Sequence, residues 1–299
     1  MSLLIAASID EAIDAIAGGA RPIAGGTDLV VGARHGKSPL PALLVAIDRI
    51  EALRRIEDSV GEGLTIGAAV SHHEIEGHRT IAAMWSALAD ASALVGSPAT
   101  RHVGTLGGNV MNGSPAMDTG APLAVFQAEA VLRSGRGTRS VAMRDLWVGP
   151  GRTSAAVDEL CIAIHLPARP TSSGSAYVRL EYRRAMEIAV VGAAASVSLN
   201  DDGTVSAVSV ALTAVAPVIL TVTGLKAVDG RSVGDIAALA AALASEQATP
   251  ISDVRASDRY RRHCIGVMAR RSVAAAASRA AGEVIAVPVN RTLGIGAAS

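Results

Sequence analysis

Residues 105–118 read TLGGNVMNGSPAMD, a glycine pair followed by small and polar residues up to an aspartate. From 96 to 113 the chain is rich in Gly, Ser, Thr, Asn and Pro, with neither a helical nor a strand period. This composition predicts a long ordered loop. Loops of that length in compact domains commonly carry function.

A second glycine pair lies upstream in IAGGTD, residues 23–28. Each pair can cradle a phosphate, because glycine lets the backbone approach closely and a loop that enters a helix points free N–H groups at an anion. Neither has the lysine of a P-loop or the spacing GxGxxG, so a nucleoside triphosphatase or NAD site has little support. The alternative for each pair is a purely structural turn.

Around these pairs the first half of the chain reads as mixed α and β. Ser8 and Glu11 form a capping-box pattern, and Ser71 and Glu74 form another, so each opens a predicted helix. Further helices are predicted at 27–34 and 81–93 and after Asp118. The predicted strands are 21–24, 43–47, 64–68, 130–132 and 161–164.

The second half has a different pattern. Residues 168–175 have the composition of a linker. Apolar and small residues alternate at 176–180, 191–199 and 204–212, and the turn 200–203 joins the last two runs, which predicts an antiparallel meander. Helices at about 231–245 and 257–281 should cover one face of that sheet.

Composition excludes several classes of protein. Lys+Arg and Asp+Glu number 27 each, so no global charge favours nucleic acid. No apolar stretch approaches the roughly 20 residues of a membrane span, and residues 1–7 lack a leader pattern, so we expect a cytoplasmic protein. Cys161 and Cys264 are too few for an iron–sulfur or zinc site, and His72, His73 and His78 have no ligand partners in sequence.

Four strings, in this order, make the chain similar to a known family. They are RPIAGGTDLV at 21–30, TLGGNVMNGSPAMDTGAPL at 105–123, YVRLEYRRAMEIAVVGAAASV at 177–197 and ISDVRASDRYRRHCIGVMARRSV at 251–273. The chain resembles the FAD-binding medium subunit of the molybdenum hydroxylases, a family that includes xanthine dehydrogenases and aerobic carbon monoxide dehydrogenases. The second string is the most specific.

The resemblance implies an α+β fold. Residues 1–167 should form a two-lobed FAD-binding domain of the vanillyl-alcohol oxidase type, with lobes at about 1–53 and 54–167. After the linker 168–175, residues 176–299 should form a C-terminal domain with an antiparallel sheet and helices that covers the flavin. FAD should lie extended between the two lobes.

The resemblance also implies cofactor contacts. The pyrophosphate should be wrapped by a first group of residues: Ile23, Ala24, Gly25, Gly26, Thr27, Asp28 and Leu29. A second group should face the phosphates and the ribityl chain: Thr105, Gly108, Asn109 and Asn112, with Ser114 as a further polar contact. Asp118 should hold the adenosine end by a ribose hydrogen bond, or else cap a helix, since its carboxylate would repel phosphate.

Arg179 occupies a position where the family pattern usually has Lys, close to the flavin ring. A fixed cation there would stabilise negative charge on reduced flavin, and the alternative is a surface charge. Glu187 stands where relatives often carry Asp, and Val95 stands where xanthine-type relatives can place an aromatic residue. Both roles stay open.

By resemblance, substrate is oxidised at a molybdopterin in a large partner subunit. Electrons then pass through two [2Fe–2S] clusters of a small partner subunit to FAD in this chain, and onward to NAD⁺, a quinone or oxygen. A dimer of such heterotrimers is left open. The sequence names neither the substrate nor the acceptor.

Two other functions compete with this one. A stand-alone FAD oxidase of the vanillyl-alcohol type would need a covalent-flavin signature or a substrate lobe with catalytic Tyr or His, and neither is present. A non-enzymatic subunit that has lost its flavin is hinted at only by Arg179 and Glu187. A bulky residue at Gly108 distinguishes a flavin-binding subunit from one that has lost its flavin. Flavin content should collapse only if the segment around Gly108 lines the cofactor.

Overall fold

The computed structural model describes residues 1–36, 38–59, 61–183 and 185–295. The chain forms two compact units built from interleaved segments. The first unit comprises Met1–Glu74, Pro98–Gly113 and Gln127–Ala168. The second comprises Ile75–Ser97, Ser114–Phe126 and Arg169–Ser299, and its residues 296–299, which belong to the predicted C-terminal domain, lie outside the described residues.

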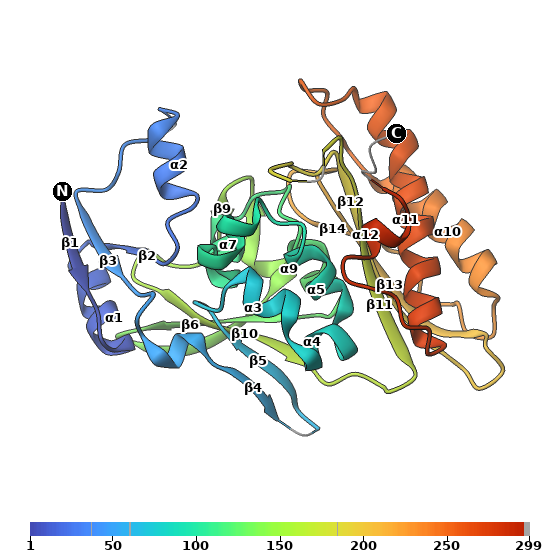
Figure 1. Cartoon of the computed structure of the whole chain (residues 1–299), viewed down its shortest axis with the longest axis horizontal. Coiled ribbons are helices and arrows are strands. Elements are labelled where there is room, and N and C mark those ends of the chain that lie inside the picture. The colour runs from blue at the N-terminus through green and yellow to red at the C-terminus, as the bar shows by residue number, and fades with distance from the viewer. Residues whose placement is uncertain (37, 60, 184, 296–299) are drawn as a thin grey trace. The chain divides into compact units, whose positions relative to one another are not determined.

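The first unit begins with a small parallel sheet in the order β1-β3-β2 (Ser2–Ile5, Leu43–Ala46 and Arg21–Ile23). Helix α1 (Ile9–Ala17) packs against it through Ala12, Ile13 and Ile16 (Figure 1). The predicted capping box is present, since the Ser8 hydroxyl accepts from the Glu11 N–H at 3.2 Å. Local capping and an apolar stripe therefore suffice to explain this helix.

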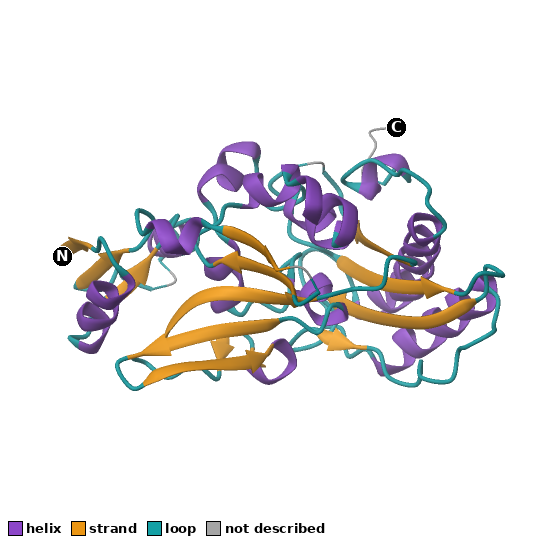
Figure 2. Cartoon of the chain, turned by 90° about the horizontal axis from the view of Figure 1, so that it is seen from below, coloured by secondary structure: helices purple, strands orange, loops and turns teal. Residues whose placement is uncertain are grey.

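A five-stranded antiparallel sheet forms the rest of this unit's framework (Figure 2). Its order is β4-β5-β10-β6-β7, at Ile56–Ser59, Gly63–Gly67, Leu160–Pro167, Glu129–Ser134 and Gly137–Ala142. The small elements of this unit are α2 (Leu29–Arg34) between β2 and β3, η1 (Glu51–Arg54) between β3 and β4, and α9 (Met143–Leu146), β8 (Trp147–Gly149) and β9 (Arg152–Thr153) between β7 and β10. The strands predicted at 64–68, 130–132 and 161–164 are confirmed.

The segment 96–113 was predicted as an ordered loop, and that prediction is wrong. It contains helices α6 (Pro98–Val103) and α7 (Leu106–Asn112), joined by Gly104 and Thr105. Both are too short to show a helical period in sequence, and tertiary contacts hold them. One such contact is the Trp147 indole N–H, which donates to the Val110 carbonyl at 3.0 Å.

Helix α3 (His72–Gly77) opens with the predicted reciprocal cap, in which Glu74 accepts from the Ser71 N–H at 2.9 Å and donates its own N–H to the Ser71 hydroxyl at 3.2 Å. The helix predicted at 81–93 is instead two helices, α4 (Arg79–Met84) and α5 (Ser86–Ser92). Trp85, at φ −122° and ψ 44°, leaves the helical conformation between them. After Asp118 comes α8 (Gly120–Val125).

The second unit contains the predicted meander. Its sheet has the order β11-β12-β13-β14, at Ser173–Leu180, Val191–Leu199, Val205–Thr213 and Leu220–Thr221. The turn 200–203 closes with the Asn200 N–H donating to Thr204 O at 2.8 Å. Strand β11 begins at Ser173, so the last three residues of the predicted linker 168–175 are already paired with β12.

Alternating side chains of this sheet face opposite layers. Residues such as Val178 and Ala193 join a core with α10 (Val233–Gln247) and α11 (Asp258–Ala280), the two predicted helices, which run side by side in Figure 1. A short helix, α12 (Val289–Thr292), follows. The intervening side chains, such as Ser175 and Tyr177, contact segments that precede the sheet in sequence. No described helix is long and apolar enough to cross a membrane.

Candidate functional site

The first glycine pair lies in the turn between β2 and α2. Gly26 has φ +67°, the left-handed region that favours glycine. Its carbonyl accepts from the Val30 N–H at 2.9 Å and so starts helix α2. In residues 1–36, 38–59, 61–183 and 185–295, no acceptor is found for the backbone N–H groups of Gly25, Gly26 and Thr27. These three successive amides are therefore available to a ligand.

Gly25 has a different reason to be glycine. A Cβ at this position would overlap the carbonyl oxygen of Val103, at the end of α6. Next to it, a Cβ on Gly104 would lie 3.5 Å from the Thr27 hydroxyl. The turn at 25–27 therefore rests directly on the α6–α7 connection, and backbone contact brings the two regions together.

The second glycine pair, Gly107 and Gly108, lies in the first turn of α7 rather than in a loop. The expectation of free N–H groups there is wrong. The Leu106 N–H donates to Val70 O at 3.0 Å and the Gly107 N–H to Ala68 O at 2.9 Å. The Gly108 N–H donates to the hydroxyl of Thr105, the N-cap residue, at 3.1 Å. The start of α7 is thus already hydrogen-bonded by the protein, and the two glycine pairs are not equivalent.

The other expected phosphate and ribityl contacts lie on or beside α7. Gly108 and Asn112 are exposed, Asn109 is half-buried and Thr105 is buried. A Cβ on Gly108 would meet only the Thr105 hydroxyl, so one side of this residue is open. Half-buried Ser114 belongs to the second unit, where its hydroxyl accepts from the Ala116 N–H at 3.2 Å.

Arg179 is neither a surface charge nor a free cation. It is fully buried on β11, and one of its N–H groups donates to the Asp118 carboxylate at 2.7 Å. Its other nitrogens donate to Glu181, and it also donates to Leu94 O at 3.0 Å. The Tyr177 hydroxyl completes the cluster by donating to Asp118 at 2.7 Å.

This contact bears on two expectations. Asp118 was expected at the adenosine end of an extended FAD and Arg179 beside the flavin ring, and the structure shows that the two side chains share a hydrogen bond, while the part of FAD that each would face stays a prediction. Asp118 does not cap a helix, because its oxygens accept from Tyr177 and Arg179. Asp118 and Arg179 therefore form one buried, hydrogen-bonded ion pair.

The electrostatics of this cluster follow from one guanidinium facing two carboxylates. Burial raises the pKa of Asp118, against the opposing effects of Arg179 and Tyr177. Burial and the neighbouring Asp118 raise the pKa of Tyr177 well above its ordinary value. Burial alone would lower the pKa of Arg179, but the carboxylates raise it, so the arginine stays charged and its charge is compensated within the protein.

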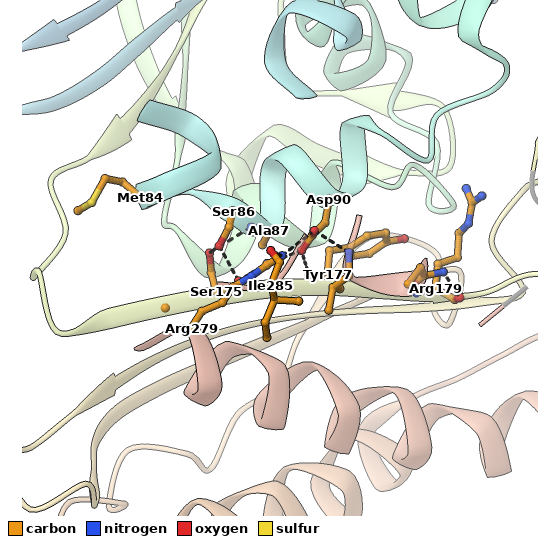
Figure 3. A network of polar contacts seen from close by, with 12 residues as sticks. Met84, Ser86, Ala87, Asp90, Ser175, Tyr177, Arg179, Arg279 and Ile285 are labelled. Atoms are coloured by element: carbon orange, nitrogen blue, oxygen red, sulfur yellow. Dashed lines mark hydrogen bonds and ion pairs between the residues drawn. The ribbon is translucent and has the colours of Figure 1, made fainter. Parts of the chain in front are cut away.

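A second buried polar network lies nearby on β11 (Figure 3). The Asp90 carboxylate on α5 accepts two hydrogen bonds from Arg279, at 2.6 and 3.0 Å. It also accepts from the backbone N–H groups of Tyr177 at 3.2 Å and Val289 at 2.9 Å. Ser86 and Ser175 add a hydroxyl contact at 3.1 Å. Sequence reasoning missed this network, since its members are far apart along the chain.

The two residues whose roles were left open have structural contacts. The Glu187 carboxylate lies 3.4 Å from Arg183, and the Glu187 carbonyl accepts from Arg179 at 3.3 Å. Val95 follows Leu94, the residue whose carbonyl binds Arg179. Neither contact by itself assigns a role toward a cofactor.

His72 lies beside the α6–α7 connection, since a Cβ on Gly104 would lie 3.5 Å from its Cδ2 atom. The backbone N–H of His72 donates to Gly104 O at 3.0 Å, and the residue is 1% exposed. Burial, together with the charge of Arg101, lowers the pKa of His72 to about 4, so the ring is neutral at pH 7. Among the described residues, no group of three or more His, Cys, Asp or Glu side chains is arranged to hold a metal ion.

Comparison with known families assigns both halves of the chain. Residues 1–169 match the family described as the FAD binding domain in molybdopterin dehydrogenase. Residues 176–276 match the CO dehydrogenase flavoprotein C-terminal domain. The predicted fold class, an FAD-binding domain followed by an antiparallel-sheet domain, is thereby confirmed.

The chain is similar to individual members of these families over most of the length of both chains. The chain is 35% identical over 268 residues to the carbon monoxide dehydrogenase medium chain of Afipia carboxidovorans, covering 87% of this chain and 90% of that one. It is 29% identical over 284 residues to the xanthine dehydrogenase FAD-binding subunit of Escherichia coli O157:H7, covering 93% and 97%. A chain of reconstituted CO dehydrogenase from Oligotropha carboxidovorans superposes with a TM-score of 0.88 at 31% identity, covering 93% and 98%. The chain therefore belongs to the FAD-binding subunits of the molybdopterin dehydrogenases, an oxidoreductase family that includes xanthine and carbon monoxide dehydrogenases.

Proposed function

We propose that the chain holds FAD by seating its diphosphate on the amides of residues 25–27. The observation that carries this proposal is that these N–H groups have no acceptor within the described residues, while the turn itself is fixed against Val103. Successive backbone amides in such a turn form a good site for phosphate oxygens. When bound, FAD supplies the electron-transfer chemistry.

Other residues then have supporting roles. Residues 23–29 wrap the diphosphate, and the exposed sides of Gly108 and Asn112, with Asn109, face the phosphates and the ribityl chain. Thr105 holds the start of α7 through Gly108, and Ser114 adds a polar contact. Asp118 and Arg179 act together as a buried cluster, and because two carboxylates compensate the guanidinium, Arg179 contributes little net positive charge to a reduced flavin.

The family supports an assembly of three different subunits, which we extend as follows. A large partner subunit oxidises the substrate at molybdopterin, a small one carries two [2Fe–2S] clusters, and this chain passes the electrons to NAD⁺, a quinone or oxygen. Two such heterotrimers associate as a dimer in the cytoplasm. The functional domains span 1–167 and 176–299, in line with the family matches at 1–169 and 176–276, and of the connecting residues 168–175 the last three already belong to β11.

Purification of the tagged chain from its native cell extract tests this assembly. We expect two further polypeptides to co-purify, one with molybdenum and one with iron, together with bound flavin. A chain that purifies alone and oxidises an alcohol with oxygen would instead support a stand-alone oxidase. Size-exclusion chromatography with light scattering separates a heterotrimer from its dimer.

Substitution of Gly108 tests the contribution of α7. A Cβ at position 108 meets only the Thr105 hydroxyl and the position is exposed, so the chain with Gly108→Leu should still fold. We expect the flavin absorbance per chain to fall at least about tenfold, because the leucine would occupy the open side on which the cofactor lies. In the control Gly234→Leu, on α10, flavin content should be unchanged. Equal flavin content in both variants would remove α7 from the cofactor site.

A further inference from the structure

Helices α10 and α11, which run side by side in Figure 1, enclose a surface groove whose lining residues have no part in the proposed cofactor site. The groove has a volume of about 550 Å³ and is lined by small residues of α10 and longer side chains of α11. At its floor a Cβ on Gly266 would lie 3.0 Å from the Ser245 hydroxyl and 3.3 Å from the Ala241 carbonyl oxygen. Small residues therefore let the two helices touch beneath the groove.

Hydrogen bonds at the end of α10 fix the spacing of the two helices. The Arg262 guanidinium, on α11, donates to Ser245 O at 3.0 Å and to Ala248 O at 3.1 Å. Carbonyls at the C-terminal end of a helix lack helical partners, so this arginine satisfies them. The Ser245 hydroxyl donates to Ala241 O at 2.9 Å. The groove is therefore formed by the protein itself, before any partner binds.

The charge of the groove comes from α11. Arg270 and Arg271 line it, and His263 lines it two turns earlier. Both arginines are exposed, and neither side chain has a hydrogen bond or an ion pair within the part of the chain that the structure describes. By contrast, Arg255 and Arg261 of the same unit both pair with Asp253. Since the residues that line the groove include no acidic one, its positive charge is uncompensated.

The α10 side of the groove is apolar. Ala238 and Ala242, four residues apart and both exposed, line it. A small anion would match the arginines but gain nothing from this apolar side. An amphipathic segment of another polypeptide would match both, because its apolar side chains can pack on the alanines while its carboxylates pair with the planar guanidinium groups.

We propose that the groove between α10 and α11 binds an acidic amphipathic segment of a partner subunit, with its carboxylates on Arg270 and Arg271. The inference rests on the proposed function, in which the chain assembles with two other subunits. It deepens that function by naming a docking surface on the second compact unit and the chemistry of the segment that it receives.

Charge reversal in the FAD-loaded full chain tests the proposal. Positions 270 and 271 are exposed, and glutamate is about as good a helix former as arginine, so the double variant Arg270→Glu with Arg271→Glu should fold. We expect its affinity for the purified partner subunits, measured by biolayer interferometry, to fall at least about tenfold, with flavin content unchanged. The fall should be smaller at high salt, which screens exposed charges.

A matched control reverses two other exposed cations of the same unit. Lys226→Glu with Arg231→Glu makes the same change in net charge outside the lining of the groove. Its affinity for the partner subunits should stay within about twofold of the wild type, as expected for surface substitutions away from an interface. Equal affinities for the two double variants would overturn the proposal.

A second pair of variants leaves the charge unchanged. Ala242→Leu fills the apolar side of the groove and should weaken partner binding at least about threefold, because the added side chain clashes with the docked segment. Ala274→Leu, exposed on α11 outside the lining, should leave the affinity unchanged. The same loss in both variants, or in neither, would contradict docking in the groove.

Cross-linking identifies the occupant. Arg271→Lys keeps the charge and supplies an amine that a carbodiimide joins to a carboxylate in direct contact. Mass spectrometry of the cross-linked complex should place this bond on an aspartate or glutamate of a partner subunit. A bond only to a second copy of this chain, or no bond, would overturn the inference. A wild-type chain that binds no partner subunit would overturn the proposed assembly itself, whereas partner binding that survives the groove variants overturns only the docking surface.

Discussion

At the scale of single residues, glycine serves three separate purposes in this site. Gly25 allows one backbone to touch another at Val103, Gly26 adopts a positive φ, and at Gly104 a Cβ would lie only 3.0 Å from the Thr100 carbonyl oxygen. The sequence shows only that these residues are glycines. Their reasons differ, and so do the effects expected of replacing them.

The change Gly25→Ala tests the close approach. Its Cβ would overlap the Val103 carbonyl, which is backbone and cannot rotate away, so we expect a loss of about 2 kcal/mol or more in the free energy of unfolding. The matched change Gly32→Ala, inside α2 with nothing near its Cβ, should stabilise by about 0.5–1 kcal/mol. Urea unfolding of both variants gives the comparison, and equal effects would contradict the close contact.

His72 predicts a pH dependence of stability. In the unfolded chain its pKa is the ordinary 6.5, and in the folded, cofactor-free chain it is about 4. The unfolded state therefore binds more protons between these values, and stability is complete above pH 6.5 and falls as the pH drops towards 4. The loss should reach about 3 kcal/mol. Urea unfolding at several pH values measures it, and His72→Leu should lose less stability over that interval. Parallel curves for the two proteins would refute a depressed pKa.

At the scale of elements, polar side chains decide how helices attach to the second sheet. Asp90 joins α5 to β11, α11 and α12 through a single carboxylate. Strands β11 to β13 were predicted correctly because their alternation and the turn 200–203 are local signals. Helices α6 and α7 were missed, because a helix of one or two turns gains most of its stability from tertiary contacts.

The change Asp90→Asn tests this attachment. An amide cannot accept all the hydrogen bonds of the carboxylate, and it leaves the charge of the largely buried Arg279 without its partner. We expect the free energy of unfolding to fall by about 3–5 kcal/mol. In the exposed pair of Arg55 and Glu51, Glu51→Gln should cost less than about 1 kcal/mol. Similar losses for both variants in urea would show that Asp90 contributes no more than a surface charge.

At the scale of the whole molecule, the two compact units do not coincide with two consecutive stretches of chain. The second unit takes in Ile75–Ser97 and Ser114–Phe126, both within the span of the FAD-binding family match. These segments cover the face of the β11–β13 sheet opposite α10 and α11, as the contacts of Ser175 and Thr213 show. The sheet is therefore complete only when the earlier segments are present.

A fragment of residues 169–299 tests this dependence. Without α5 and α8 it would expose one apolar face of its sheet and leave Arg179 without Asp118. We expect no cooperative urea transition for the fragment and strong binding of the dye ANS, whereas the full chain should unfold cooperatively. A cooperative transition of the fragment would show that the C-terminal part is independent of the earlier segments.

The sequence by itself determined the family, the capped helices, the meander and the first glycine turn. Each of these depends on a short motif or on the spacing of apolar residues within one segment. Only the tertiary structure decided that Gly25 touches Val103, that the amides of α7 are already used, that Arg179 is compensated by Asp118 and Glu181, and that His72 is buried without a partner. Each of these facts depends on which distant residues packing brings together. Burial then sets the charge and the free hydrogen-bonding capacity of a side chain, and a residue's identity carries no record of its burial.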